Sequence, residues 1–210
     1  MSKVLLVGTL SALLLLSLTS MLVVKASPGT IELIGKEWSH DPLKVYIKAP
    51  SDLVDDVLTA LNDWSDALKA ASENSSALFN FIVVSSSKEA DIEITVQRGA
   101  AAGVLGMTSL QDKNKDGYLD KVKIFVKAGP GFDPADLRNV VRHEIGHALG
   151  LGHETTAEFD LMDPTYDASA ISYDVYPSTL DLKALLLIYG NDGFGLPNLP
   201  PEEIPSSYSG

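Results

Sequence analysis

Alternating hydrophobic and polar residues mark several short stretches of the chain, and a period of two residues predicts β-strands. Residues 43–48 (LKVYIK) and 91–96 (DIEITV) alternate in this way, while residues 78–84 are almost continuously apolar or β-branched. Weaker patterns over residues 104–110 and 122–126 predict two more strands. The sequence therefore predicts five strands, all of them before the last third of the chain.

Helical signals occur in two longer stretches. Residues 52–71 repeat their apolar side chains at the spacing of a helix. A second helix is expected from Pro134 to Leu149, because Asp133 can cap it, proline suits its first position and Asp136 lies in its first turn. Gly150 is expected to end this helix, since glycine readily adopts the left-handed backbone found at helix C-termini.

A third helix is expected near the end of the chain. Ser178 and Asp181 resemble a capping box, and the helix would continue through Tyr189 to Gly190. At the start of the chain, a strand–helix–strand order requires a crossover connection, which is typical of parallel strands. The order of elements predicts a single α/β domain whose chemistry lies in its C-terminal half.

The two ends of the chain differ from this domain. Lys3 is followed by an uncharged apolar run that ends at Lys25, and Ala26 is a small residue at a plausible cleavage point. Residues 1–26 are therefore expected to be a secretory signal peptide, or an N-terminal membrane anchor if they are retained. Residues 191–210 are rich in proline and lack a periodic pattern, which predicts a flexible tail. The protein is expected outside the cell, with membrane contact only through the N-terminal segment.

Composition excludes several classes of function. The chain has 210 residues and a formal net charge of −12, and an acidic surface repels the phosphates of nucleic acids. It contains no cysteine, so disulfides, thiolate metal sites and a cysteine nucleophile are excluded. We expect a monomer that does not bind nucleic acid.

The strongest candidate site is an H-E-x-x-H motif formed by His143, Glu144 and His147 within the second predicted helix. Residues four apart lie on one face of a helix, so both imidazoles can reach a single metal ion, and Glu144 can act on its bound water. His153 can reach the same ion only if the chain turns sharply at Gly150. Three histidines with a fourth position for water are expected of a catalytic zinc site.

The extended motif H-E-x-x-H-x-x-G-x-x-H resembles that of the metzincin zinc endopeptidases. Met162, nine residues after His153, resembles the methionine turn of these enzymes, and Pro164 and Tyr166 resemble the matrixin branch in particular. The last predicted helix is also similar to that of matrixins, and the likeness covers residues 43–190. We therefore expect a matrixin-like peptidase domain over residues 27–190.

This resemblance implies a zincin-like fold. It consists of a twisted, mostly parallel five-stranded sheet with an antiparallel edge strand, a long active-site helix and a C-terminal helix. It also implies that protein or peptide substrates pair with the edge strand, here residues 104–110. A substrate side-chain pocket would lie between the zinc helix and the segment after Met162, lined by Pro164 and Tyr166.

Three features depart from the matrixin pattern. Glu154 follows the third histidine where matrixins usually carry serine, as it does in astacins. His40 is the only histidine outside the motif, so the second, structural zinc of matrixins cannot be built in the same way, and His40 is expected to be a surface residue. The lack of cysteine also excludes latency through a pro-segment thiol.

A second candidate metal site is the acidic loop between the fourth and fifth predicted strands. Its ligand spacing matches a calcium-binding loop, with oxygens from Asp112, Asn114, Asp116, the carbonyl of Tyr118, and Asp120. Lys123 stands where such loops normally carry a bidentate glutamate. The alternatives are a structural calcium that fixes the hairpin and a solvated hairpin turn whose charge is neutralised by lysines.

Together these features predict an exported zinc metalloendopeptidase in which Glu144 is the general base. The alternative is an exported metal-binding or adhesion module that has the same fold but little turnover. The intact set of His143, Glu144, His147 and His153 favours the peptidase, because a binding module has no need of a general base.

Overall fold

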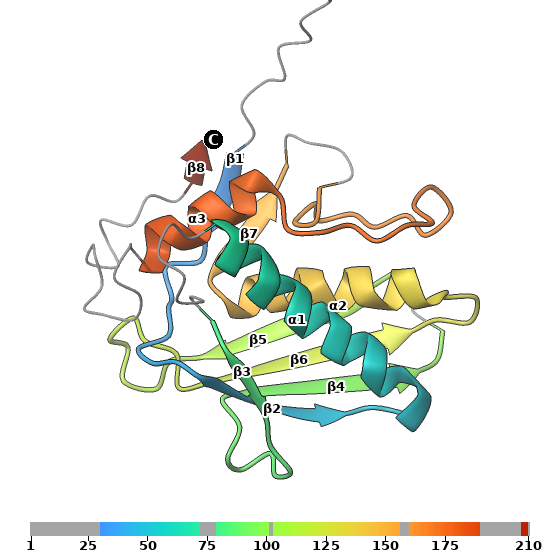
Figure 1. Ribbon diagram of the computed structural model, residues 1–210, viewed down its shortest axis with the longest axis horizontal. Coiled ribbons are helices and arrows are strands. Elements are labelled where there is room, and N and C mark those ends of the chain that lie inside the picture. Colours follow the sequence, from blue (N-terminus) through green and yellow to red (C-terminus); the bar gives the residue numbers. More distant parts are fainter. Residues whose placement is uncertain (1–29, 72–78, 101–102, 156–159, 190–206, 210) are drawn as a thin grey trace, which may run out of the picture.

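The computed structural model describes residues 30–71, 79–100, 103–155, 160–189 and 207–209. Its larger sheet has the strand order β3-β2-β4-β6-β5 (Figure 1). The strands are β2 (Leu43–Lys48), β3 (Phe81–Val83), β4 (Ile92–Arg98), β5 (Gly106–Gln111) and β6 (Lys121–Ala128). All neighbours in this sheet are parallel except β5, which pairs antiparallel with β6. The predicted mostly parallel sheet with an antiparallel edge strand is confirmed.

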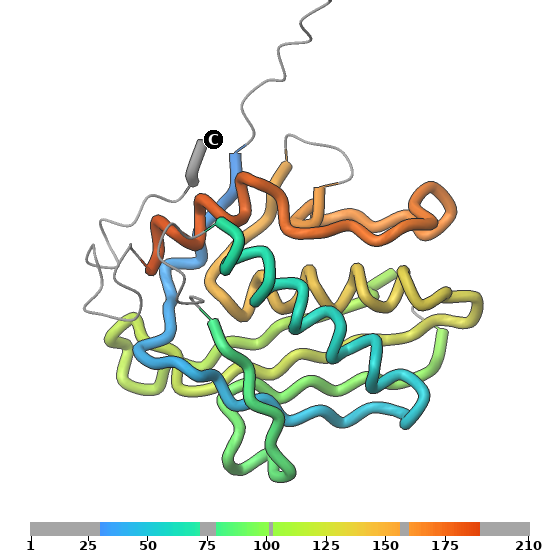
Figure 2. The backbone as a smooth tube through the Cα atoms, viewed as in Figure 1, coloured from blue at the N-terminus to red at the C-terminus, as the bar shows by residue number. Residues whose placement is uncertain are grey.

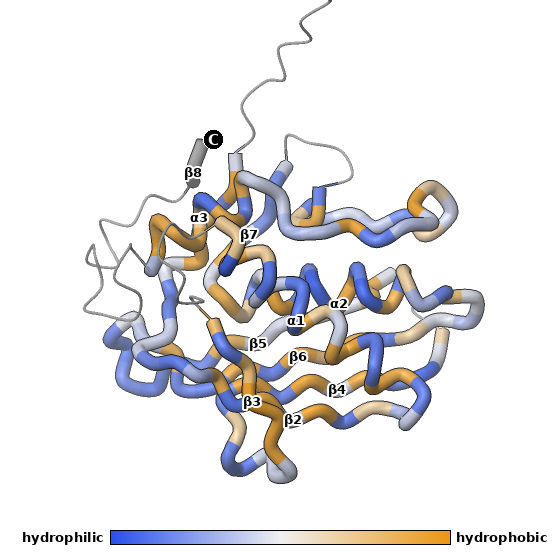
Figure 3. The backbone as a smooth tube through the Cα atoms, in the orientation of Figure 1, coloured by the Kyte–Doolittle hydropathy of each residue, from blue (hydrophilic) through white to orange (hydrophobic). Residues whose placement is uncertain are grey.

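Two helices cover one face of this sheet, as Figure 1 shows. A short 3-10 turn, η1 (Ser51–Leu53), leads into α1 (Val54–Ala71), and α2 (Pro134–Ala148) packs beside it. Buried apolar residues of β2, β4 and β6 form one core with those of these helices. Figure 3 shows these strands largely in the colour of hydrophobic residues. Trp64 of α1 is buried there and donates a hydrogen bond of 3.0 Å from Nε1 to the carbonyl of Arg142.

The helix boundaries follow the local signals in the sequence. Asp133 and Asp136 form a capping box at the start of α2, with hydrogen bonds of 2.8 and 2.9 Å between side chain and backbone. Ser178 and Asp181 form the same arrangement at the start of α3 (Thr179–Tyr189). The predicted helices are therefore confirmed. Their starts could be predicted because a capping box involves residues only three positions apart in the sequence.

A second, small sheet was not predicted. It consists of β1 (Thr30–Leu33), β7 (Leu151–Glu154) and β8 (Ser207–Ser209), in the order β7-β1-β8 with antiparallel pairing. The prediction that residues 43–48 form the first strand is wrong, since β1 precedes them. Each of these strands has at most four residues, too few for a period to be recognised, and its partners lie far away in the sequence.

The two terminal predictions fall largely on parts of the chain that the structure does not describe. Residues 1–26 lie outside the described residues, as do residues 191–206 and 210 of the predicted tail. β8 lies within the predicted tail. Among the described helices, none is both long enough and apolar enough to cross a lipid bilayer.

Candidate metal centre

The three motif histidines converge on one point. His143 and His147 lie on the same face of α2, and His153 approaches from β7 after the turn at Gly150. One ligand atom from each histidine lies within 4.8 Å of those of the other two. Within the described ranges of the chain, this is the one group of three such side chains close enough to share a metal ion.

Backbone carbonyl groups orient two of the three rings. Nδ1 of His143 lies 2.8 Å from the carbonyl oxygen of Leu161, and Nδ1 of His147 lies 2.8 Å from that of Leu151. Because a carbonyl oxygen only accepts hydrogen bonds, each Nδ1 carries the proton and each Nε2 is left to bind a metal. Leu161 belongs to the methionine turn, so this turn fixes the orientation of the first ligand.

Burial keeps these histidines in the form that binds metal. Desolvation lowers the pKa of His143 to about 4, with a smaller contribution from the neighbouring His147. The pKa of His147 is also lowered, chiefly by desolvation. Three converging imidazoles, two of them with Nδ1 bound to a carbonyl group and Nε2 available, fit the ligand set of a catalytic zinc ion.

The methionine turn lies directly beneath the zinc helix. Met162 is fully buried, and a Cβ atom on Gly146 of α2 would lie only 2.5 Å from its sulfur atom. The backbone N–H of Glu154 donates a hydrogen bond of 2.9 Å to the carbonyl of Met162, which ties the turn to β7. Gly146 therefore allows the close approach of helix and turn, a role that the sequence analysis did not assign.

Gly150 makes the turn between α2 and β7. Its φ angle is +105°, a backbone conformation that residues other than glycine rarely adopt. A Cβ atom at this position would also lie 2.7 Å from the carbonyl oxygen of Lys36. The sharp turn expected at Gly150 is thus present, and it directs the chain toward β1 and His153 toward the other histidines.

Glu144 lies between α2 and the edge strand β5. It is 4% exposed, and burial raises the pKa of its carboxyl group to about 7. The hydroxyl of Thr108 lies 2.5 Å from Oε2 of Glu144 and partly counteracts this increase. Gly106 on the same strand leaves room for the carboxylate, since a Cβ atom there would lie 2.2 Å from Oε1. Neither contact was predicted from the sequence.

A cavity of about 540 Å³ opens beside the histidines. One side is formed by residues 103–108 of the edge strand and the segment before it, and the other by the segment after the methionine turn. Pro164 and Tyr166 lie on this second wall, together with the buried Ile171. The three histidines and Glu144 line the cavity between these walls.

Polar contacts fasten the second wall to α2. Figure 2 shows the segment from residue 160 to 178 running back along this helix. The buried Asn139 donates from Nδ2 to the hydroxyl of Tyr166 and to the carbonyl of Tyr173, over 3.1 and 2.9 Å. The Tyr166 hydroxyl in turn donates to Asp136 over 2.8 Å. Burial is the main reason that the pKa of Tyr166 is raised, so the phenol stays neutral.

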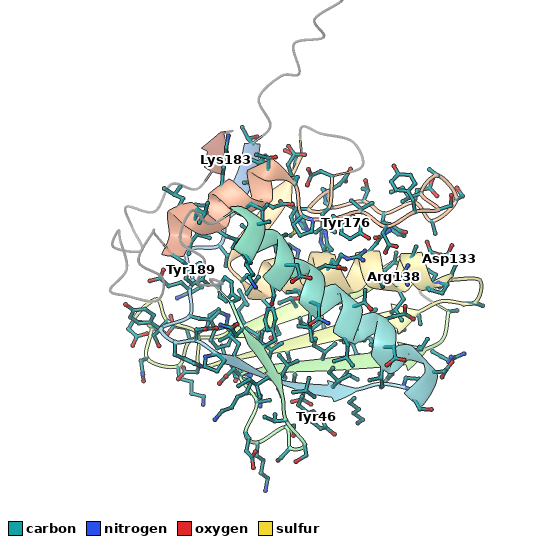
Figure 4. All side chains as sticks on the ribbon, viewed as in Figure 1. Tyr46, Asp133, Arg138, Tyr176, Lys183 and Tyr189 are labelled. Atoms are coloured by element: carbon teal, nitrogen blue, oxygen red, sulfur yellow. The ribbon has the colours of Figure 1, made fainter. Side chains whose placement is uncertain are left out.

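Two arginines of α2 add ion pairs to the same wall. Arg138, which is labelled in Figure 4, forms a bidentate pair with Asp174, with both distances 2.7 Å. It also binds Asp56 of α1. The fully buried Arg142 binds Asp174 and Asp63, and its guanidinium lies 4.7 Å from the ring centre of Tyr176. The hydrogen bond from Arg138 is the main cause that holds the pKa of Asp174 at about 2.

The acidic loop is arranged differently from the histidines. It connects β5 and β6 as expected, but its carboxylates accept hydrogen bonds from the backbone of the loop itself. Asp112 accepts from Asp116 and Gly117, Asp116 accepts from Tyr118, and Asp120 accepts from Lys113 over 2.6 Å. Asn114 is exposed.

A lysine from outside the loop also contacts its first carboxylate. The ammonium of Lys36 forms an ion pair with Asp112, and this hydrogen bond is the main reason that the pKa of Asp112 is lowered. The loop is held against the same segment by backbone hydrogen bonds between Glu37 and both Gly117 and Leu119. The lysines within the loop were expected to neutralise its charge, and Lys36, from outside the loop, adds a further positive charge.

Two further residues of the sequence predictions, His40 and Asp181, do not line this cavity. His40 is exposed, as predicted, and its Nε2 lies 3.3 Å from Asp91. Behind the methionine turn, the carboxyl group of Asp181 is fully buried, with its pKa raised to about 7 by burial and by the nearby Asp160 and Glu154. Asp181 was predicted only as a helix cap, and burial was not apparent from its sequence position.

The comparison with known protein families agrees with this geometry. The family model of the matrixins, a family of zinc metallopeptidases, matches residues 37–190. This range includes the larger sheet, all three helices, the histidine triad and the methionine turn. The match covers most of the chain and begins slightly before the resemblance seen in the sequence. The chain belongs to the matrixin family.

Proposed function

We propose that the protein is an exported zinc endopeptidase that hydrolyses internal peptide bonds of proteins or peptides. One observation carries this proposal: three converging histidines lie beside a buried glutamate in one open cavity. The family adds weight, because matrixins are zinc metallopeptidases that bind a catalytic zinc ion.

His143, His147 and His153 would hold the zinc ion. Zinc, when bound, polarises the carbonyl group of the scissile bond and lowers the pKa of water at the site. Glu144 accepts a proton from the attacking water and then donates it to the amine that leaves. A carboxyl group with a pKa near 7 suits both steps, since it takes up and releases a proton near neutral pH.

The substrate would bind in extended form along β5. This strand is the last of its sheet, and residues 103–108 line the cavity next to Glu144. A peptide that pairs with an exposed strand gains most of its affinity from backbone hydrogen bonds, so many sequences can bind. Selectivity would come from the side-chain pocket between α2 and the wall formed by Pro164 and Tyr166.

Export, oligomeric state and calcium belong to the same proposal. The apolar run within residues 1–26 supports secretion, or anchoring with the catalytic domain outside the cell. We propose a monomer whose acidic loop binds calcium weakly through Asp112, Asn114, Asp116, Tyr118 and Asp120. The ligand spacing supports this binding, and the Lys36–Asp112 ion pair would have to open first.

Digestion of a peptide library tests the proposed activity. The parent protein, loaded with zinc, should cleave internal bonds, and a chelator should abolish cleavage until zinc is restored. Glu144→Gln should retain zinc and fold but lose about 10²–10⁴-fold in hydrolysis, because it removes the general base. A parent protein that binds zinc and cleaves nothing would instead be a metal-binding module.

A further inference from the structure

The edge strand presents two residues toward Glu144. Successive side chains of a strand point to opposite faces, and Gly106 and Thr108 pair with Val126 and Ile124, which are buried in the core beneath the helices. Met107, between them, is 58% exposed and points away from α2. Gly106 and Thr108 therefore form a notch in β5 that faces the zinc helix.

The carboxylate of Glu144 lies in this notch. Its Oε1 occupies the space next to Gly106, where a Cβ atom would approach to 2.2 Å. Its Oε2 lies 2.5 Å from Oγ1 of Thr108, within the range of a strong hydrogen bond from a hydroxyl to a carboxylate. The backbone carbonyl of Glu144 is farther from the same hydroxyl, at 3.1 Å, so the single hydroxyl proton is directed to Oε2.

The two oxygens of the Glu144 carboxylate have different surroundings. Within the described part of the chain, Thr108 donates the one hydrogen bond that the Glu144 carboxylate receives. Oε2 is thereby held by Thr108, whereas Oε1 lies beside Gly106 and accepts no hydrogen bond from the described residues, so it is available to accept a proton from water. A glutamate has several rotatable bonds, so a carboxylate without such a donor would sample orientations that do not reach the water.

We infer that Thr108 is a positioning residue for the general base: its hydroxyl, with the space at Gly106, holds the Glu144 carboxylate in its working orientation. This inference rests on the proposed function of Glu144. It assigns to β5 a role beyond pairing with substrate, since the strand that would bind the peptide also orients the group that removes the proton.

Three matched variants test the inference on the zinc-loaded protein. Thr108→Val keeps the shape of the side chain and removes the donor, Thr108→Ser keeps the donor, and Thr95→Val makes the same change on β4, outside the cavity. Thr108→Val should lower kcat about ten- to a hundredfold, the effect of losing a hydrogen bond to a charged group, at unchanged KM and zinc content. Thr108→Ser and Thr95→Val should keep kcat within about threefold of the parent.

A thermal unfolding cycle gives a second readout that does not depend on turnover. The change in Tm caused by Thr108→Val should largely disappear in a Glu144→Ala background, because the two residues then no longer interact. Parental kcat in Thr108→Val, an equal loss in Thr108→Ser, or additive changes in Tm would each overturn the inference. These results would leave the proposed function intact, whereas absence of hydrolysis by the parent would overturn the proposed function and this inference with it.

Discussion

The two predicted metal sites of this protein look equally regular in the sequence and are built very differently. The histidine triad lies on a helix and a short strand, with the Nδ1 atoms of His143 and His147 bound to carbonyl groups and their Nε2 atoms available. The acidic loop between β5 and β6 satisfies its carboxylates with its own backbone N–H groups and with Lys36. One site is organised for a cation, and the other is already occupied by internal partners.

The difference arises from the chemistry of the ligands. An imidazole has two nitrogens, so a backbone contact that fixes one nitrogen leaves the other free to bind metal. The carboxylates of this loop find backbone donors two to seven residues away, and these contacts compete with a cation for the same oxygens. Spacing on regular secondary structure is therefore a stronger indication of a metal site than spacing on a loop.

The largest expected effect is on zinc binding, which should differ between variants that each lose one ligand from one of the two sites. His147→Ala removes one of three histidines, and zinc affinity should fall by at least about a hundredfold, more than the effect of removing an outer partner. Asp116→Ala should leave zinc content unchanged, because the loop is not part of the triad. Metal analysis after dialysis measures both, and full zinc occupancy in His147→Ala would contradict the ligand assignment.

A calcium titration of the melting temperature tests the loop itself, with zinc held constant. Calcium at a hundredfold excess over its dissociation constant should stabilise the parent by about 2.7 kcal/mol. Lys36→Met should reach this effect at lower calcium, because Asp112 then loses its competing cation. Asp116→Ala is the control, and its melting temperature should rise least on addition of calcium. If the parent and Asp116→Ala respond equally, the loop is a solvated turn.

The last prediction concerns the pH dependence of stability and rests on Asp181, a carboxyl group buried behind the methionine turn. Its pKa is raised from 3.8 to about 7 on folding, so the folded protein binds the proton more tightly than the unfolded chain. The resulting stabilisation is complete below pH 3.8 and is lost as the pH rises through about 7. Between pH 5 and pH 8 the loss should be roughly 2 to 3 kcal/mol, because each pH unit between the two pKa values is worth about 1.4 kcal/mol.

Asp181→Asn removes this titration while its amide oxygen can still cap α3. The difference in unfolding free energy between Asp181→Asn and the parent should therefore favour the variant increasingly from pH 5 to pH 8. Urea unfolding at several pH values measures this difference, and taking it relative to the parent cancels the titration of the histidines. A difference that stays constant across this range would show that Asp181 does not titrate there.

The sequence by itself determined the elements whose signals are local. Asp133, Asp136 and Gly150 define the ends of α2 within a few residues, and the four-residue spacing of His143 and His147 places both on one helix face. The alternation in residues 43–48 and 91–96 likewise predicts two strands, β2 and β4, that the structure places in the larger sheet. Capping and periodicity depend on neighbours along the chain, so they can be recognised without the fold.

Only the tertiary structure decided which distant residues meet at the site. β1 and β7 are too short to show a period, yet their pairing supports the strand that carries His153. The contacts of Thr108 with Glu144 and of Lys36 with Asp112 join residues far apart in the chain. Such contacts leave no local pattern, because each partner alone is an ordinary strand, helix or loop residue, and only the tertiary packing of the chain brings them within bonding distance.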